Sequence, residues 1–153
     1  MIGGNFRLHE LQAAFLRIKL RHLDQALKNR RENAVRLIRE LQDKWKAVFP
    51  VEQCLCEGER QGPKNYPEGT VLLPFSCQKN EGDHTWNQFV IRVLGEGQRD
   101  NLRLRLSTTG VQTEIYYPKS LHQQQCFQEN SGECKDAEQM VYEVLAIPLA
   151  LEF

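Results

Sequence analysis

The spacing of apolar residues in the first third of the chain constrains the fold more than any other feature. From residue 8 onward, apolar side chains recur at three- and four-residue intervals, with charged and amide residues between them, as in an amphipathic helix. They are Leu8, Leu11, Phe15, Ile18, Leu23, Leu27, Ala34, Leu37, Ile38, Leu41 and Trp45. The pattern predicts one long or bent helix, or two helices end to end, that Pro50 terminates.

A turn-forming segment precedes this helical pattern. Gly3 and Gly4 permit a sharp backbone path, and Asn5 is a favourable residue for the N-cap of a helix. We therefore expect the first helix to begin directly after Asn5, with its side chain at the helix start.

The rest of the chain alternates between strand-like and helix-like segments. Residues 70–77 and 84–94 favour strands, residues 98–110 favour a helix with Leu102 and Leu106 inward, and residues 111–118 favour another strand. A last helix is expected over residues 136–148, with one apolar face made of Ala137, Met140, Val141, Val144 and Leu145. The fold class is α+β: a long N-terminal helix plus a small, mainly antiparallel sheet flanked by helices.

Composition excludes several classes of function. Lys plus Arg and Asp plus Glu both total 20, so no net positive field attracts the chain to nucleic acid or to an anionic membrane. The most apolar run, residues 144–153, is short and contains Pro148, and no signal peptide is visible. We expect a cytoplasmic protein that binds neither nucleic acid nor membrane.

The cysteines permit one alternative reading. There are five, an odd number without an export signal, which favours reduced thiols. Cys54, Cys56, Cys77 and His84 could be combined into a zinc site, but they lack the paired C-x-x-C spacing of zinc knuckles. A zinc-binding module is the most distant of the alternatives, and no metal ligand is assigned.

No self-contained catalytic motif is present. The chain lacks a phosphate-binding P-loop, an H-E-x-x-H helix and a nucleophile elbow, and its four histidines are scattered along the sequence. Spacing alone leaves the function open and assigns no catalytic residue.

Four segments in order resemble one known family. The segments are "GGNFRLHELQAAFLRIKLRHLD" followed by "RRENA", then "HTWNQFVIR", "RDNLRLRLSTTGVQTEIYYPKSLHQQQCF" and "AEQMVYEVLAIPL". Together they are similar to the motifs of the DegT/StrS family of pyridoxal-phosphate-dependent aminotransferases, which act on nucleotide-linked keto sugars. The resemblance covers nearly the whole chain and implies the small C-terminal domain of a fold-type-I aminotransferase. It divides the chain into a connecting and dimerisation helix region, residues 1–49, and a small α+β domain, residues 50–153.

The resemblance also implies roles for individual residues. Asn5 matches the family asparagine that reaches across the dimer interface to the cofactor phosphate of the partner subunit, and Arg7 matches the arginine of the same motif. Tyr116, Tyr117 and His122 match a loop near the active site, which makes them candidate substrate-binding residues. Ser120 takes the place of the family's usual proline in that loop.

The departures from the family are equally informative. The family's Schiff-base lysine and the aspartate that pairs with the pyridine nitrogen precede the segment that this chain matches, and none of the chain's lysines lies in the lysine motif. We therefore expect a C-terminal portion that is inactive alone, binds no cofactor alone, and forms a homo-oligomer through its first helix. The alternative from another class is a standalone interaction module.

Overall fold

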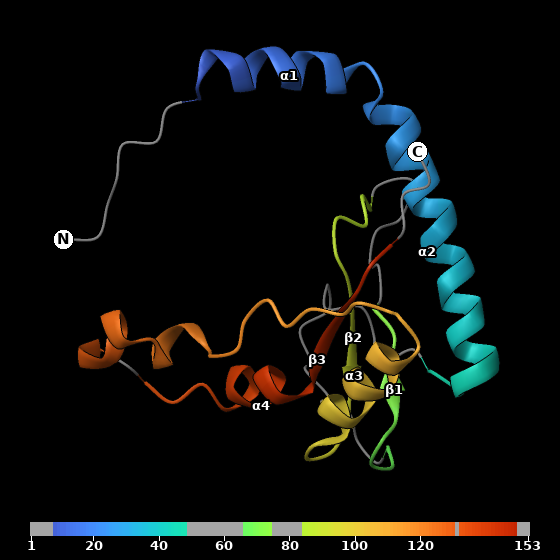
Figure 1. The fold of residues 1–153 in the computed structure, drawn as a ribbon. Coiled ribbons are helices and arrows are strands. Elements are labelled where there is room, and N and C mark those ends of the chain that lie inside the picture. Colours follow the sequence, from blue (N-terminus) through green and yellow to red (C-terminus); the bar gives the residue numbers. More distant parts are fainter. Residues whose placement is uncertain (1–7, 49–65, 75–83, 131, 150–153) are drawn as a thin grey trace, which may run out of the picture.

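The computed structural model describes residues 8–48, 66–74, 84–130 and 132–149 (Figure 1). Its helices are α1 (Glu10–Leu20), α2 (Leu23–Trp45), α3 (Gln98–Thr108) and α4 (Lys135–Glu143), with two 3-10 helices, η2 (Leu121–Gln123) and η3 (Gln125–Asn130). The strands are β1 (Val71–Leu72), β2 (Phe89–Val93) and β3 (Val144–Ile147). The predicted α+β class is confirmed, with helices around a small antiparallel sheet.

The N-terminal helical region consists of two helices end to end. The break falls at Arg21 and His22, and α1 begins later than expected because His9, and not Asn5, is its N-cap. His9 Nδ1 accepts a hydrogen bond from the Leu11 N–H at 3.3 Å, and Gln12 Oε1 accepts one from the His9 N–H at 3.3 Å. These two bonds form a capping box. Asn5 itself lies outside the described residues.

The second helix ends by its own C-cap and not at Pro50. Lys46 adopts a left-handed conformation with φ of 54°, and its N–H donates to the Leu41 carbonyl. A left-handed residue directly after the last helical residue is a common way to terminate a helix. The helical pattern in the sequence therefore ends at Trp45.

The sheet has the order β1-β2-β3, with both strand pairs antiparallel. Along β2 the side chains of Phe89, Ile91 and Val93 are buried while those between them are partly exposed, which is the alternation that a strand imposes. Ile91 pairs with Leu145, and both are fully buried. These residues form the centre of the hydrophobic core.

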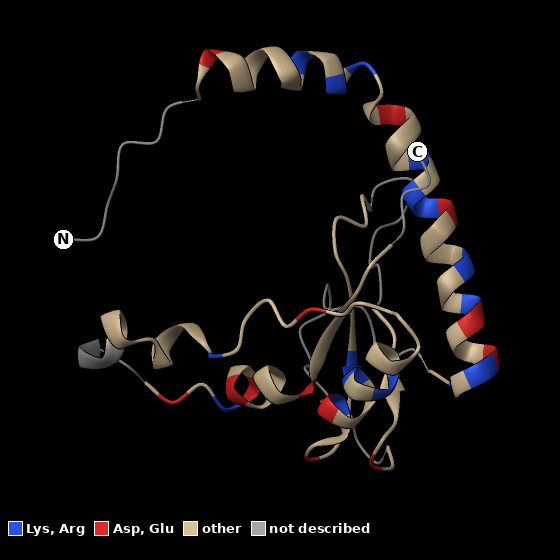
Figure 2. Ribbon diagram, in the orientation of Figure 1, with Lys and Arg blue, Asp and Glu red and all other residues tan. Residues whose placement is uncertain are grey.

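Only α2 of the two N-terminal helices contributes to this core. Ala34 and Leu41 are buried in the core cluster, and Leu37, Ile38 and Trp45 pack against it. By contrast, α1 contains no buried residue, and it extends away from the sheet in Figure 1. Charged residues of both signs are interspersed along α2, whereas most of α1 is uncharged (Figure 2).

Two predictions were wrong: the strand over residues 111–118 and the end of the last helix. Residues 111–118 do not form a strand, and only Glu114 makes an isolated bridge, to Ala146. The last helix ends at Glu143, and residues 144–147 form β3 instead of its final turn. Val144, Leu145, Ala146 and Ile147 are all apolar, so the segment fits either a helical face or a buried strand, and pairing with β2 decides between them.

The junction between α4 and β3 is held by a buried arginine of α3. Arg99 Nη1 donates to the carbonyls of Val141 at 3.0 Å and Val144 at 3.4 Å, and its Nε donates to Asp100 Oδ1 at 2.6 Å. The last carbonyls of a helix lack partners within the helix and favour a cation. Arg99 therefore lets the chain pass from helix to strand without a connecting loop.

None of the helices in the described ranges is long and apolar enough to cross a membrane.

Candidate functional site

The segment from Glu114 to His122 carries the three predicted substrate-binding residues. It is attached at its start to β3, because the N–H groups and carbonyls of Glu114 and Ala146 exchange hydrogen bonds of 3.1 and 2.9 Å. Ile115 then packs against the hydrophobic core. The next residues, Tyr116 and Tyr117, are 48% and 67% exposed. We call residues 114–122 the tyrosine loop.

The second half of the tyrosine loop turns inward at Ser120. Its backbone is extended, with φ of −65° and ψ of 152°, and its carbonyl accepts a hydrogen bond from the Gln123 N–H at 3.0 Å at the start of η2. Ser120 is buried, and its Oγ has no hydrogen-bond partner within the part of the chain that the structure describes. A φ near −65° is also the value that proline requires, so the backbone here suits the family's usual residue.

The loop ends in a hydrogen-bonded contact with α4. His122 Nε2 lies 2.7 Å from Glu138 Oε1, and the two side chains are 17% and 34% exposed. The same carboxylate oxygen accepts a hydrogen bond from the Cys134 N–H at 3.3 Å, at the first turn of α4. The hydrogen bond from His122, followed by the one from the Cys134 N–H, lowers the pKa of Glu138 below its ordinary value of 4.5. Glu138 is therefore ionised at neutral pH.

The structure thus brings three of the predicted site residues into one loop. Tyr116, Tyr117 and His122 lie on a segment fixed to β3 at one end and to α4 at the other. Sequence reasoning did not single out Glu138, because its partner is 16 residues away in sequence and no motif spacing joins them. The predicted cofactor-phosphate residues, Asn5 and Arg7, lie outside the described residues.

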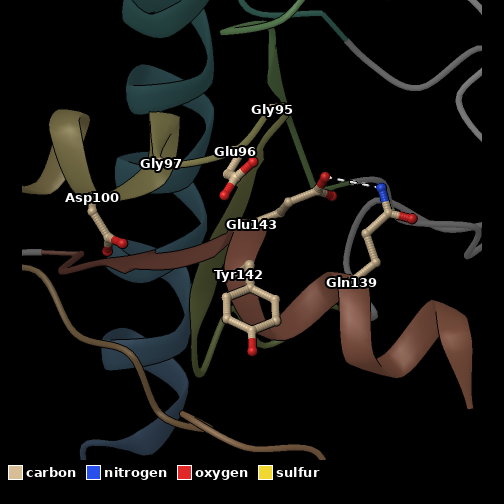
Figure 3. A pocket seen from close by; sticks show the side chains of 7 residues that line it. All are labelled: Gly95, Glu96, Gly97, Asp100, Gln139, Tyr142 and Glu143. Atoms are coloured by element: carbon tan, nitrogen blue, oxygen red, sulfur yellow. Dashed lines mark hydrogen bonds between the residues drawn. The ribbon is translucent and has the colours of Figure 1, made fainter.

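A pocket of about 310 Å³ opens on another side of α4 (Figure 3). It lies between the turn before α3 and the last turn of α4, and its lining residues are Gly95, Glu96, Gly97, Asp100, Gln139, Tyr142 and Glu143. Gly95 and Gly97 have φ of 100° and 71°, and this left-handed backbone favours glycine.

Two of the three acidic side chains of this pocket, Asp100 and Glu143, already have partners. Glu143 accepts from Arg92 Nε at 2.5 Å and from Gln139 Nε2 at 3.0 Å, and Asp100 pairs with Arg99. The dashed bond of Figure 3 joins Gln139 to Glu143. The Glu143 side chain is only 9% exposed, so loss of its Arg92 partner would leave a buried, unpaired charge at the junction of α4 and β3. We assign this pocket a structural role.

The suggested zinc site receives no support from the described residues. Within them, no group of three or more His, Cys, Asp or Glu side chains could hold a metal ion. His84 Nδ1 accepts from the Trp86 N–H at 2.9 Å, and the two rings are 4.1 Å apart. The other three proposed ligands, Cys54, Cys56 and Cys77, lie outside the described residues.

The exposed side of α1 is a second candidate site. Leu8, just before the helix, and Leu11, Phe15 and Ile18 on it recur at intervals of three and four residues, and each is more than half exposed. Large exposed apolar surfaces mark interaction sites on soluble proteins. We call these four residues the α1 apolar face.

Comparison with known proteins agrees with this architecture. The model of the DegT/DnrJ/EryC1/StrS aminotransferase family matches residues 1–53 and 66–153. The chain is 30% identical over 152 residues to a pleiotropic regulatory protein of Geobacillus stearothermophilus, covering 97% of this chain and 34% of that protein. It is 32% identical over 150 residues to the erythromycin biosynthesis sensory transduction protein EryC1 of Saccharopolyspora erythraea, covering 96% of this chain and 33% of that protein.

A transaminase and a solved structure each resemble this chain to about the same extent as these two proteins do. The chain is 29% identical over 149 residues to the dTDP-3-amino-3,6-dideoxy-alpha-D-galactopyranose transaminase of Aneurinibacillus thermoaerophilus, covering 97% of this chain and 33% of the relative. The crystal structure of S. venezuelae DesV in complex with a ketimine intermediate superposes with a TM-score of 0.64 at 27% identity, covering 97% of this chain and 33% of DesV. The chain spans about a third of the length of these relatives.

Proposed function

The chain belongs to the DegT/DnrJ/EryC1/StrS aminotransferase family, and we propose that it forms the small C-terminal domain, with its connecting helices, of a pyridoxal-phosphate-dependent nucleotide-sugar aminotransferase. The observation that carries the proposal is that similarity to these enzymes extends over 97% of the chain, in sequence and in fold. A relative named as a dTDP-sugar transaminase supports the substrate class. We place the enzyme in the cytoplasm.

In this proposal the tyrosine loop lines the nucleotide-sugar pocket. Tyr116 and Tyr117 offer exposed rings and hydroxyl groups, and His122 offers an imidazole whose position is fixed by α4. Because the loop is attached to β3 and to α4, its side chains are held ready for a ligand at a small entropic cost. The loop contributes binding and orientation and no covalent step.

Pyridoxal phosphate supplies the electron sink for transamination when it is bound to the complete enzyme. We propose that Asn5 and Arg7 contact its phosphate across the dimer interface, since an amide and a guanidinium near a helix start are suitable anion ligands. Both residues lie outside the described part of the chain.

We propose the same division of the chain that the family resemblance implies. Residues 1–49 connect and dimerise, and residues 50–153 form the small domain. The α1 apolar face would be covered in the complete enzyme by the large domain and the partner subunit, while Ala34 and Leu41 of α2 join the connecting region to the sheet. When the 153-residue chain is isolated, the uncovered face should cause self-association.

Self-association is tested by sedimentation at about tens of micromolar, a range that detects modest affinities. We expect a dimer or larger species for the wild-type chain and a monomer for Phe15→Glu, which places a charge in the α1 apolar face. Tyr142→Glu, on α4, is a matched control because Tyr142 is 67% exposed and Phe15 68%. A monomeric wild-type chain, or equal loss of association in both variants, would refute this role of α1.

The catalytic part of the proposal is tested by adding pyridoxal phosphate and then borohydride to the isolated chain. Binding groups without an activated lysine do not supply the covalent step of transamination, so we expect no stoichiometric adduct at one lysine. Supplying a large domain from a family member should restore activity, and Asn5→Ala should then weaken cofactor binding. A specific, stoichiometric lysine adduct in the isolated chain would contradict the proposal.

The exposure of the α1 apolar face also favours a second function, a standalone interaction module whose inherited site residues are idle. The complementation experiment separates the two. A standalone module would self-associate through α1 but would restore no transaminase activity with any large domain. The proposed C-terminal domain would restore that activity.

A further inference from the structure

The contact between His122 and Glu138 determines which nitrogen of the imidazole is available to a ligand. Glu138 is ionised at neutral pH because its pKa lies below its ordinary value. An ionised carboxylate can only accept hydrogen bonds. At a separation of 2.7 Å, His122 Nε2 must therefore be the donor, and the hydrogen of the neutral ring resides on Nε2.

The other ring nitrogen is then left as an acceptor. His122 Nδ1 has no hydrogen-bond partner within the described ranges, and 17% of the side chain is exposed. A neutral imidazole carries one hydrogen, so if Nε2 bears it, Nδ1 has only a lone pair. Nδ1 can bind a hydroxyl or an amine hydrogen, and in this state it does not bind a carboxylate or phosphate oxygen.

Glu138 is itself held by a second contact. The oxygen that accepts from His122, Oε1, also accepts from the Cys134 N–H at 3.3 Å, so the first turn of α4 orients the carboxylate. After the hydrogen bonds from His122 and the Cys134 N–H, the charge of Lys135, whose ammonium group pairs with Glu133 at 3.6 Å, also favours the carboxylate form of Glu138. The histidine is thus oriented by a group that is oriented by the backbone, the arrangement by which proteins commonly select one tautomer.

We propose that Glu138 is a positioning residue for His122: it keeps the hydrogen of the neutral ring on Nε2 and so makes Nδ1 the acceptor that the tyrosine loop offers to a hydroxyl group of the ligand. The proposal rests on the proposed function only for the presence of His122 in the pocket. The tautomer of the ring is a property of the chain alone.

The test is 15N NMR of the histidine ring nitrogens in the 153-residue chain, recorded above the pH at which the ring is protonated. We expect His122 Nε2 to show the shift of a nitrogen that carries hydrogen, and Nδ1 that of one that does not. Glu138→Ala should abolish this difference and give a mixture of tautomers, while Glu138→Gln, which keeps an oxygen acceptor, should restore it. Glu133→Ala, an exposed carboxylate beside the same turn, should leave the ring shifts unchanged.

Three results would overturn the proposal. They are a wild-type ring with its hydrogen on Nδ1, a Glu138→Ala spectrum identical to wild type, and a Glu138→Gln variant that behaves like Glu138→Ala. Dispersed amide spectra of both variants show that the fold is retained. Because no substrate is used, any of these results leaves the assignment of the chain as an aminotransferase domain intact, and failed complementation leaves the tautomer assignment intact.

Discussion

Replacing Arg92 by leucine should destabilise the chain far more than removing an exposed ion pair. Arg92 lies in the central strand β2, opposite Val144, and its Nε donates to Glu143 Oε2 at 2.5 Å. The two side chains are 17% and 9% exposed. After Arg92→Leu, Gln139 is the one partner among the described residues that the Glu143 carboxylate keeps, and it donates to the other oxygen at 3.0 Å.

The magnitude follows from the burial of the pair. Removing one partner of a buried ion pair costs about 3–5 kcal/mol, because the remaining charge is buried without compensation. The partial exposure of Arg92 lets water reach the site, so we expect a loss of roughly 2–4 kcal/mol in the free energy of unfolding. Replacing both residues by leucine removes the charge itself, and the double variant should recover to within about 1 kcal/mol of the wild type.

Urea denaturation followed by far-UV circular dichroism measures these differences, and the double-mutant cycle gives the coupling energy. The control is Lys44→Met, which breaks an i,i+4 pair with Glu40 whose side chains are 71% and 51% exposed. Such a pair contributes only about 0.3–0.5 kcal/mol. The reasoning is refuted if Arg92→Leu costs no more than Lys44→Met, or if Arg92→Leu and Glu143→Leu are simply additive.

Two further substitutions test the tyrosine loop and its attachment to α4. Ser120→Ala removes a buried hydroxyl that lacks a partner within the described residues. The free energy of unfolding, measured by urea denaturation, should therefore stay the same or rise by up to about 1 kcal/mol. A fall of more than about 1 kcal/mol would show that the hydroxyl has a partner. The lowered pKa of Glu138 means that the folded state holds this proton less tightly than the unfolded chain, so its contribution is present above pH 4.5 and is lost as the pH falls through the lower, folded pKa. The stability difference between wild type and Glu138→Gln should therefore be smaller at about pH 3 than at about pH 7, and a difference that grows on acidification would contradict the assignment.

Local patterns in the sequence predicted those elements whose residues fit a single type of secondary structure. The helical spacing from Leu8 to Trp45 identified the region of α1 and α2, and the aromatic and β-branched residues within 84–94 identified the region of β2. Leu102 and Leu106 pack against the core from α3, as predicted. Motif order was sufficient for the family. The site roles of Asn5, Arg7, Tyr116, Tyr117 and His122 stay predictions.

Only the tertiary structure decided the elements that local patterns leave ambiguous. Residues 144–147 are apolar at every position, which suits a helix face as well as a buried strand, and their place beside β2 made them β3 while residues 111–118 kept a single bridge. Nothing in the local sequence assigns roles to Arg99 or Glu138, because each contacts a partner in another element. Arg99 contacts the carbonyls at the end of α4, and Glu138 contacts the imidazole of the tyrosine loop. Periodicity reports which side of an element is apolar, whereas a hydrogen bond depends on where two elements meet, and that is set by the packing of the whole chain.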